Sequence, residues 1–119
     1  MTVRASLNRV PIEHVARDRA GILARDFVSS ERSDLAARPD RTIAGRLAAK
    51  RALCELWSGL FPGLAADPRD FVLACEASGA PRLLAAFGQP PPASIGISIA
   101  HSQFLAVGLV AAPFPGGRE

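Results

Sequence analysis

Apolar residues change their spacing part-way along the chain, and the change predicts two kinds of structure. From about residue 13 to residue 60 they recur every three or four positions, which is the spacing of a helix with one buried face. Pro39 interrupts this pattern, so we predict one helix over residues 17–27 and a second over residues 42–58. After residue 67 the spacing shortens to alternation, which is typical of half-buried strands.

The alternating segments predict two hairpins. The run FVLACE, the turn residues SGAP and the run RLL follow one another over residues 71–84, as in a hairpin with a glycine-containing turn. The later run IGISIAHSQFLAVGLVAA divides into two strands at His101, Ser102 and Gln103, with isoleucines alternating on one face of the first strand. We also expect a short strand within VPIEHV, residues 10–15.

Together these elements predict an α+β fold in which early helices pack on a small antiparallel sheet. A chain of 119 residues has the length of one domain, so we expect a single domain over residues 1–119, with residues 1–9 and 113–119 frayed. No apolar run approaches the roughly 20 residues that span a bilayer. Cys54 and Cys75 stand in neither a metal-binding nor a redox spacing. We therefore expect a soluble cytoplasmic protein with no membrane partner.

The chain carries a net charge of +3, but its basic residues are interleaved with acids, as in EHVARDRAGILARDFVSSERSD. That arrangement is typical of a solvated helix face rather than of a nucleic-acid-binding stripe. Six phenylalanines, one tryptophan and no tyrosine offer few rings on which bases would stack. We therefore expect no nucleic-acid partner, while a small polyanion or an acidic protein remains open as a ligand.

The middle of the second predicted helix, GRLAAKRALCEL, places four charges in a largely apolar stretch. Arg46 and Lys50 are four residues apart and share one helix face. Arg51 and Glu55 share the next face. In one interpretation Lys50 is solvated and Arg51 forms a surface ion pair with Glu55, worth about 0.3–0.5 kcal/mol. In the other, the three cations form a phosphate-binding surface, and the spacing alone leaves both open.

Three segments occur in an order that resembles a known family. RLAAKRALCEL, then SGAPRLL, then IGISIAHSQFLAVGLV are similar to landmarks of the 4'-phosphopantetheinyl transferases, especially the short holo-acyl-carrier-protein synthase type. In that family the helix is approximately (W/F)-A-x-K-E-A-x-x-K, the turn is G-x-P, and a late strand ends in S-(I/L)-(S/A)-H. Earlier, ILARDFVSSERSDL is similar to the family's segment with an aromatic residue, a serine and a glutamate, here Phe27, Ser30 and Glu31. The resemblance covers about residues 10–111.

The resemblance implies a fold, a reaction and a site. These enzymes move the phosphopantetheine arm of coenzyme A to a serine hydroxyl of an apo acyl carrier protein and release adenosine 3',5'-bisphosphate, with Mg²⁺ bridging the pyrophosphate. By position, Lys50 is expected near the phosphates and the reacting centre. Ser98 and His101 are expected to contact the phosphates of the nucleotide, and Gly79 and Pro81 to shape the adenine side of the pocket.

The chain differs from the family at the positions where the family has acidic metal ligands. Arg51 stands where the family has a glutamate that serves as metal ligand and candidate base, and Glu55 stands where it has a lysine. The other metal ligand is an aspartate of the early strand, for which Glu13 is the best match. One carboxylate beside an arginine makes a poor Mg²⁺ site, because Mg²⁺ requires oxygen ligands in octahedral geometry. Our hypothesis is that Arg51 replaces the metal through bidentate hydrogen bonds to phosphate, leaving Glu55 as candidate base.

Several alternatives remain open at this point. His101 is equally compatible with an exposed turn histidine, and Glu13 with an ordinary surface acid. Trp57 and Phe61 are expected to be core or interface anchors. The chain is a transferase, a catalytically impaired homologue that binds coenzyme A or a carrier protein, or an interaction protein with a shared architecture. Because the chain is too short to build a two-lobed cleft, we expect a homo-oligomer, with the trimer as the form that the resemblance implies.

Overall fold

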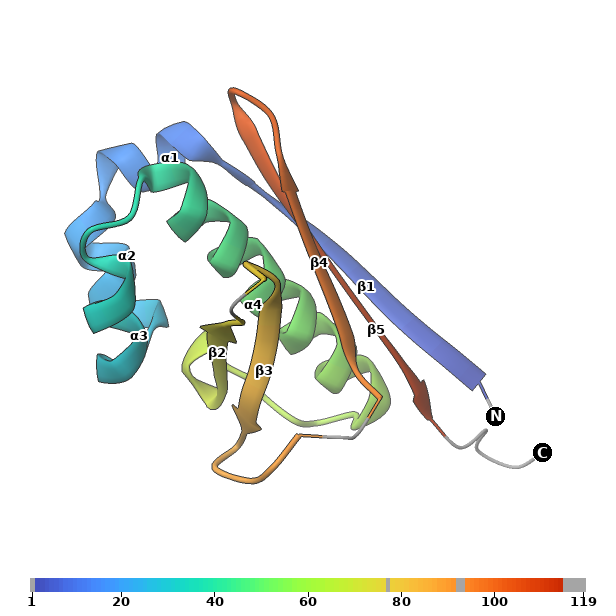
Figure 1. The fold of residues 1–119 in the computed structure, drawn as a ribbon. Helices are drawn as coiled ribbons and strands as arrows, with labels where there is room; N and C mark the ends of the chain where they lie inside the picture. Colours follow the sequence, from blue (N-terminus) through green and yellow to red (C-terminus); the bar gives the residue numbers. More distant parts are fainter. Residues whose placement is uncertain (1, 77, 92–93, 115–119) are drawn as a thin grey trace.

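The computed structural model describes residues 2–76, 78–91 and 94–114 of the chain. Its fold is α+β, which confirms the predicted class (Figure 1). In chain order the elements are β1 (Thr2–Pro11), α1 (Ile12–Arg17), α2 (Arg19–Asp26), α3 (Ser29–Leu35), α4 (Asp40–Leu60), the 3₁₀ helix η1 (Pro68–Asp70), β2 (Phe71–Cys75), β3 (Pro81–Ala86), β4 (Gly96–His101) and β5 (Leu105–Phe114). None of the described helices combines the length and the apolar character that crossing a bilayer requires.

The strands form two antiparallel sheets that lie against the same long helix. One sheet has the strand order β1-β5-β4, and the other is the hairpin β2-β3. Figure 1 shows α4 lying between the hairpin and the three-stranded sheet, with α1, α2 and α3 gathered at its N-terminal end. Strand β1 pairs with β5 along its whole length, from Thr2 opposite Phe114 to Pro11 opposite Leu105.

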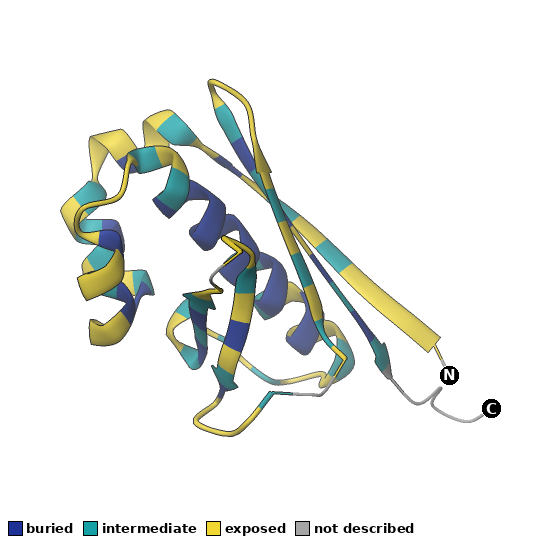
Figure 2. Cartoon of the chain, viewed as in Figure 1, coloured by how far each residue is buried: buried dark blue, intermediate teal, exposed yellow. Residues whose placement is uncertain are grey.

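Helix α4 contributes more buried apolar residues than any other described element. Every residue from Ile43 to Lys50 is buried, and Figure 2 shows the buried positions running along most of the helix. The helix approaches β5 closely at Gly108, where an added Cβ atom would lie 2.6 Å from the Cα atom of Ala49 and 2.7 Å from the carbonyl carbon of Ala48. Only a glycine allows this approach, and so the sheet and the helix pack with their backbones in contact.

The structure confirms the later elements and refines the earlier ones. Both predicted hairpins are present, although His101 is the last residue of β4 rather than part of the turn. The turn is closed by Ser102, whose backbone N–H donates to the carbonyl of Leu105 at 2.8 Å. The second predicted helix is two residues longer at each end than expected. Where a single helix over residues 17–27 was predicted, the structure has α2 flanked by the short helices α1 and α3.

Two expectations about the start of the chain are wrong. Residues 10–15 do not form a strand of their own, because Val10 and Pro11 are the end of β1 and α1 begins at Ile12. Residues 2–9 are not frayed but belong to β1. The strand was missed because it stands at the start of the chain, where fraying is common, and has few large apolar residues; two of them, Val3 and Leu7, are 69% and 43% exposed. At the other end, residues 113 and 114 belong to β5, and residues 115–119 lie outside the described part of the chain.

Candidate functional site

Lys50 lies in the interior of the protein and not on a solvent-facing surface of α4. Its side chain is fully buried, and its Nζ atom lies 2.5 Å from Oε1 of Glu31, whose side chain is 1% exposed. The same Nζ donates to the backbone carbonyl of Asp26 at 2.9 Å and lies 4.4 Å from the ring centroid of Phe27. The ammonium group is therefore fully occupied by the segment that precedes and includes α3.

The Glu31 carboxylate joins three elements of the fold. Besides the ammonium of Lys50 it accepts the backbone N–H of Val28 at 3.0 Å and that of Leu73 on β2 at 3.0 Å. Burial lowers the pKa of Lys50, and the attraction and hydrogen bond of Glu31 oppose that shift. The pair thus fastens α3, α4 and β2 together at the centre of the molecule, where neither charge reaches solvent.

Glu55 faces β1 from the side of α4. Its carboxylate accepts the hydroxyl of Ser6 at 3.3 Å and the side-chain amide of Asn8. Arg51 lies one helical turn earlier and is half-buried, but its guanidinium makes no hydrogen bond or ion pair with any other described residue. The predicted surface pair between Arg51 and Glu55 is therefore not formed, since Glu55 pairs with β1 instead.

Arg46 belongs to the buried side of α4, one turn before Lys50. Its side chain is 7% exposed and its nearest acidic partner is Asp34, with 3.9 Å between Nη2 and Oδ2. At that distance the contact is an ion pair without a hydrogen bond. Arg46 and Lys50 therefore face the same α3 segment, but they do not together form an open cationic surface.

His101 lies in a different place, at the N-terminal end of α4. It lines an open hollow of about 710 Å³ together with Ile12, Pro39, Asp40, Arg41, Ser102 and Gln103. The exposed Arg41 supplies a cation to this hollow and Asp40, which pairs with Arg19 at 2.7 Å, supplies an acid. At about 1.5 Å per residue, the 14 residues from Arg41 to Glu55 span about 21 Å of helix. His101 and Glu55 of one chain are thus too far apart to act on one atom.

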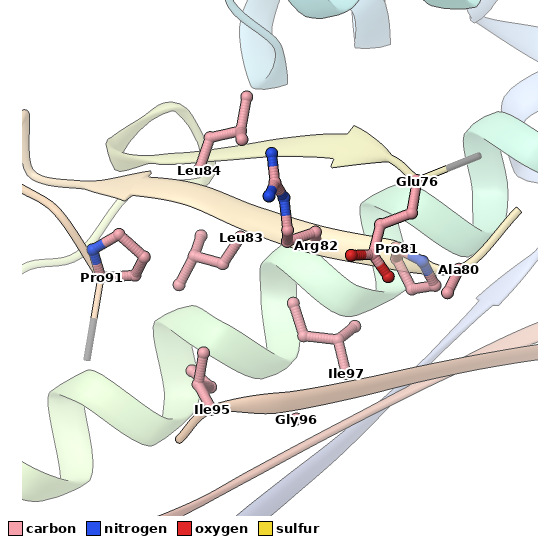
Figure 3. A pocket seen from close by; sticks show the side chains of 10 residues that line it. All are labelled: Glu76, Ala80, Pro81, Arg82, Leu83, Leu84, Pro91, Ile95, Gly96 and Ile97. Carbon is pink, nitrogen blue, oxygen red and sulfur yellow. The ribbon is translucent and has the colours of Figure 1, made fainter. Parts of the chain in front are cut away.

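Gly79 and Pro81 lie at the turn between β2 and β3. Gly79 has a φ of 91°, a conformation that favours glycine, and its N–H donates to the carbonyl of Glu76 at 2.8 Å. Pro81 begins β3 and lines an open hollow of about 690 Å³ between β3 and β4. Figure 3 shows Leu83, Ile95 and Ile97 pointing toward one another across this hollow, which is therefore apolar at its floor.

Ser98 and Glu13 lie away from these groups. Ser98 pairs in register with Leu109, and both side chains are on the outer face of the sheet, because the neighbouring Gly108 faces α4. Ser98 and His101 are an odd number of residues apart on β4, so they point to opposite faces. Glu13 lies on α1, where it pairs with Arg17 at 2.6 Å with 70% of its side chain exposed.

The structure thus brings together only part of the site expected from the sequence. Phe27, Glu31 and Lys50, which come from two segments of the resemblance, do meet, but in the core. Ser6 and Asn8 were not expected near the site. The signal that would have indicated them is the alternation of β1, in which the polar positions 6 and 8 share a face with the buried Val10.

The residues near β1 and α4 do not fit a divalent metal. No residue of β1 is acidic, so the acid expected on the early strand is absent, and Asn8 and Ser6 instead donate to Glu55. Within residues 2–76, 78–91 and 94–114, no three or more His, Cys, Asp or Glu side chains gather where they could hold a metal ion. A single carboxylate that already accepts two hydrogen bonds does not supply the octahedral oxygen ligands that Mg²⁺ prefers.

Comparison with solved structures shows which proteins share this arrangement. The ACPS–CoA complex from Chronobacterium ammoniagenes matches 98% of this chain and 100% of its own, with a TM-score of 0.76 and 18% identity. The holo-(acyl-carrier-protein) synthase of Bacillus anthracis str. Ames, solved in complex with CoA (3',5'-ADP), matches 90% of this chain and 92% of its own, with a TM-score of 0.72 and 20% identity. The fold is that of the holo-(acyl-carrier-protein) synthases.

The acyl carrier protein synthase of Mycobacterium tuberculosis shares the same fold, at 25% identity and a TM-score of 0.68 over 93% of this chain and 96% of its own. No protein-family model matches the sequence, and the comparison with curated proteins found no match. The likeness to the holo-(acyl-carrier-protein) synthases therefore lies in the backbone arrangement.

Proposed function

We propose that this protein is a 4'-phosphopantetheinyl transferase-like protein that binds coenzyme A and acts on a serine of an apo acyl carrier protein. The observation that carries the proposal is the match to a CoA-bound synthase along 98% of this chain and 100% of the other. A fold shared from end to end, rather than over one motif, supports looking for the site on helix α4 and at the end of β4.

The reaction places defined demands on these positions. The serine oxygen forms a bond to the phosphorus that carries the phosphopantetheine arm, the bond from that phosphorus to adenosine bisphosphate breaks, and the serine proton passes to a base. Arg51 is the free cation nearest to Glu55 along α4 and would balance the charge of the pyrophosphate. Glu55 is exposed and is the carboxylate available as base, while His101 and Arg41 would hold a phosphate in their hollow.

Lys50 takes a supporting role in this proposal. Its ammonium is buried against Glu31 and has no exposed surface, so it would not contact a phosphate directly. It would instead fix the positions of α3, α4 and β2, and through β2 the turn that contains Gly79 and Pro81. This role differs from the direct phosphate contact that the sequence led us to expect.

A homo-oligomer forms part of the proposal. The outer face of the sheet β1-β5-β4 exposes Val3, Leu7 and Leu109, and a shallow apolar hollow of about 270 Å³ lies beside Leu109. Neighbouring exposed apolar side chains on a sheet are typical of a surface covered by another molecule. The spacing of about 21 Å along α4 separates His101 from Glu55 within one chain, so a site that used both residues would have to take them from two copies.

One specific observation favours a second function, that of a catalytically impaired homologue which binds coenzyme A or a carrier protein without transferring the arm. Both oxygens of the Glu55 carboxylate already accept hydrogen bonds, from Ser6 and Asn8. These two bonds hold the carboxylate against β1 and compete with a hydrogen bond from a substrate hydroxyl. A base restrained in this way would transfer slowly or not at all, while binding would be unaffected.

Mass spectrometry tests the transferase function directly. The purified protein is incubated with coenzyme A and a panel of apo acyl carrier proteins, each accompanied by a variant in which the acceptor serine is alanine. Transfer predicts that the phosphopantetheine mass is added to the intact carrier and not to its alanine variant. Binding of coenzyme A in a calorimeter without any added mass would favour the impaired homologue. Absence of both would contradict the proposal.

A further inference from the structure

Three polar side chains, Ser6, Asn8 and Glu55, gather at the junction between β1 and α4. None of them belongs to the hydrophobic core. Ser6 and Asn8 lie on the inner face of β1, and both donate to Glu55. The two oxygens of the carboxylate are each used, Oε2 by the hydroxyl and Oε1 by the amide. Hydrogen bonds therefore join the strand to the helix one turn from Arg51, which stands where the resemblance implies a metal-binding glutamate.

The donors at this junction exclude a metal on chemical grounds. An amide group that donates its N–H to a carboxylate keeps one neutral oxygen, and the hydroxyl of Ser6 is a weak ligand. A divalent cation would have to displace both hydrogen bonds and would still find one carboxylate, whereas Mg²⁺ requires near-ideal octahedral oxygen geometry. The positive charge of Arg51, one turn away on the same helix face, would oppose its approach.

Arg51 could provide the positive charge that Mg²⁺ provides in the family's reaction. It is half-buried and belongs to a helix whose preceding turns are fully buried, so its stem is held in place. Its guanidinium has no hydrogen-bond or ion-pair partner among the described residues. A guanidinium presents several N–H donors in a plane and binds two phosphate oxygens at once.

We infer that this protein holds the pyrophosphate of its ligand with Arg51 and without a divalent cation. The part of the inference that concerns the ligand rests on the proposed binding of coenzyme A. The part that concerns the metal rests only on the side chains of this protein. It predicts that the affinity for coenzyme A is the same in Mg²⁺ and in EDTA, within about twofold, because the cation that pairs with the phosphates is covalently part of the helix.

Calorimetric titration with coenzyme A in Mg²⁺ and in EDTA tests the ligand half of the inference. The variant Arg51→Glu should lose about tenfold or more in affinity in EDTA, since it replaces a charge-assisted pair by a repulsion. The control Arg69→Glu makes the same change in net charge at an exposed residue of η1 and should bind like the unaltered protein. Loss of binding in EDTA by the unaltered protein would overturn the inference.

Titration with Mn²⁺ alone tests whether the protein binds a divalent cation in the absence of coenzyme A. The electron paramagnetic resonance signal of free Mn²⁺ monitors the titration. The unaltered protein should leave that signal unchanged, and the variant Asn8→Asp with Arg51→Glu, which gathers three carboxylates, should reduce it. Specific Mn²⁺ binding by the unaltered protein would overturn the inference. If coenzyme A binds under neither condition, the proposed function fails, and the Mn²⁺ titration still decides whether this junction holds a metal.

Discussion

Replacing Lys50 by methionine removes the ammonium group and keeps a flexible, unbranched side chain. The change leaves the carboxylate of Glu31, 1% exposed, with two backbone N–H donors but without a counter-charge. Removing one partner of a buried ion pair costs about 3–5 kcal/mol. A domain of this length loses about 4 °C in melting temperature per kcal/mol, so we expect Lys50→Met to lower the melting temperature by about 12–20 °C.

The reciprocal change, Glu31→Gln, should cost less, about 1–3 kcal/mol. Burial already lowers the pKa of Lys50, so this lysine can release its proton once the attraction of Glu31 is gone. A neutral amine would still donate to the carbonyl of Asp26. The double variant contains no unpaired charge, so it should be more stable than the two single effects added together by about 1–3 kcal/mol.

The matched control is an ion pair of nearly equal length on the surface. Arg17 lies 2.6 Å from Glu13, against 2.5 Å for Lys50 and Glu31, but its side chain is 74% exposed. Arg17→Met should therefore cost less than about 0.5 kcal/mol. All variants are unfolded by heat and by urea at one protein concentration, and the fluorescence of Trp57, which is 7% exposed in the core, follows both transitions.

The comparison between the two pairs can refute the reasoning. If Lys50→Met costs no more than Arg17→Met, the ammonium of Lys50 is solvated and not buried. Lys50 would then be free to bind a phosphate, as the family resemblance implies, and its supporting role in the proposed function would be wrong.

Three further predictions concern packing, assembly and pH. Gly108→Ala should cost about 1–3 kcal/mol or more in urea unfolding, because its methyl group would lie 2.6 Å from the Cα atom of Ala49; an unchanged stability would show that α4 can move away from β5. Leu109→Glu adds a charge to the apolar outer face and should reduce the mass measured by light scattering to that of the monomer, whereas an unchanged oligomer would exclude this face as the interface. Burial raises the pKa of the Cys54 thiol to about 12 from an ordinary 9.0, so in the Cys75→Ala variant this thiol should resist alkylation until the chain unfolds. The unfolded thiol releases its proton above pH 9.0 while the folded one keeps it, so the free energy of unfolding should fall as the pH rises from 9.0 toward 12; an identical profile for Cys54→Ala would contradict this.

The elements with a one-sided apolar pattern could be predicted from the sequence. Helix α4 and the hairpins β2-β3 and β4-β5 each bury one face against the same core, so their apolar residues repeat with the period of the element. The short helices α1 and α3 could not be separated from α2 in this way. Each has six or seven residues, which is too few turns for a period to be recognised.

The partner of Lys50 could not be predicted from its own helix. The spacing relates Lys50 to Arg46 and to other residues of α4, whereas its acid lies 19 residues earlier on α3, and the acid in turn binds Leu73, 42 residues further on. Such contacts depend on how three elements pack, and a local pattern contains no information about them. The local sequence around Lys50 is therefore compatible with both a solvated and a buried lysine.

Strand β1 was missed for a different reason, which also bears on assembly. Its alternation is clear, but the apolar residues Val3 and Leu7 point outward and the polar residues Ser6 and Asn8 point toward α4. Alternation in a sequence does not show which face is inward, and the terminal position led us to predict fraying instead. In the structure the apolar face of β1 is the outer one, whereas a half-buried strand usually turns its apolar face to the core. Both faces of β1 would have a suitable partner if the inner face contacts α4, where Glu55 accepts from the polar side chains, and the outer apolar face contacts a second copy of the chain. Glu55 accounts for the polar inner face within one chain, and the proposed homo-oligomer would account for the apolar outer face.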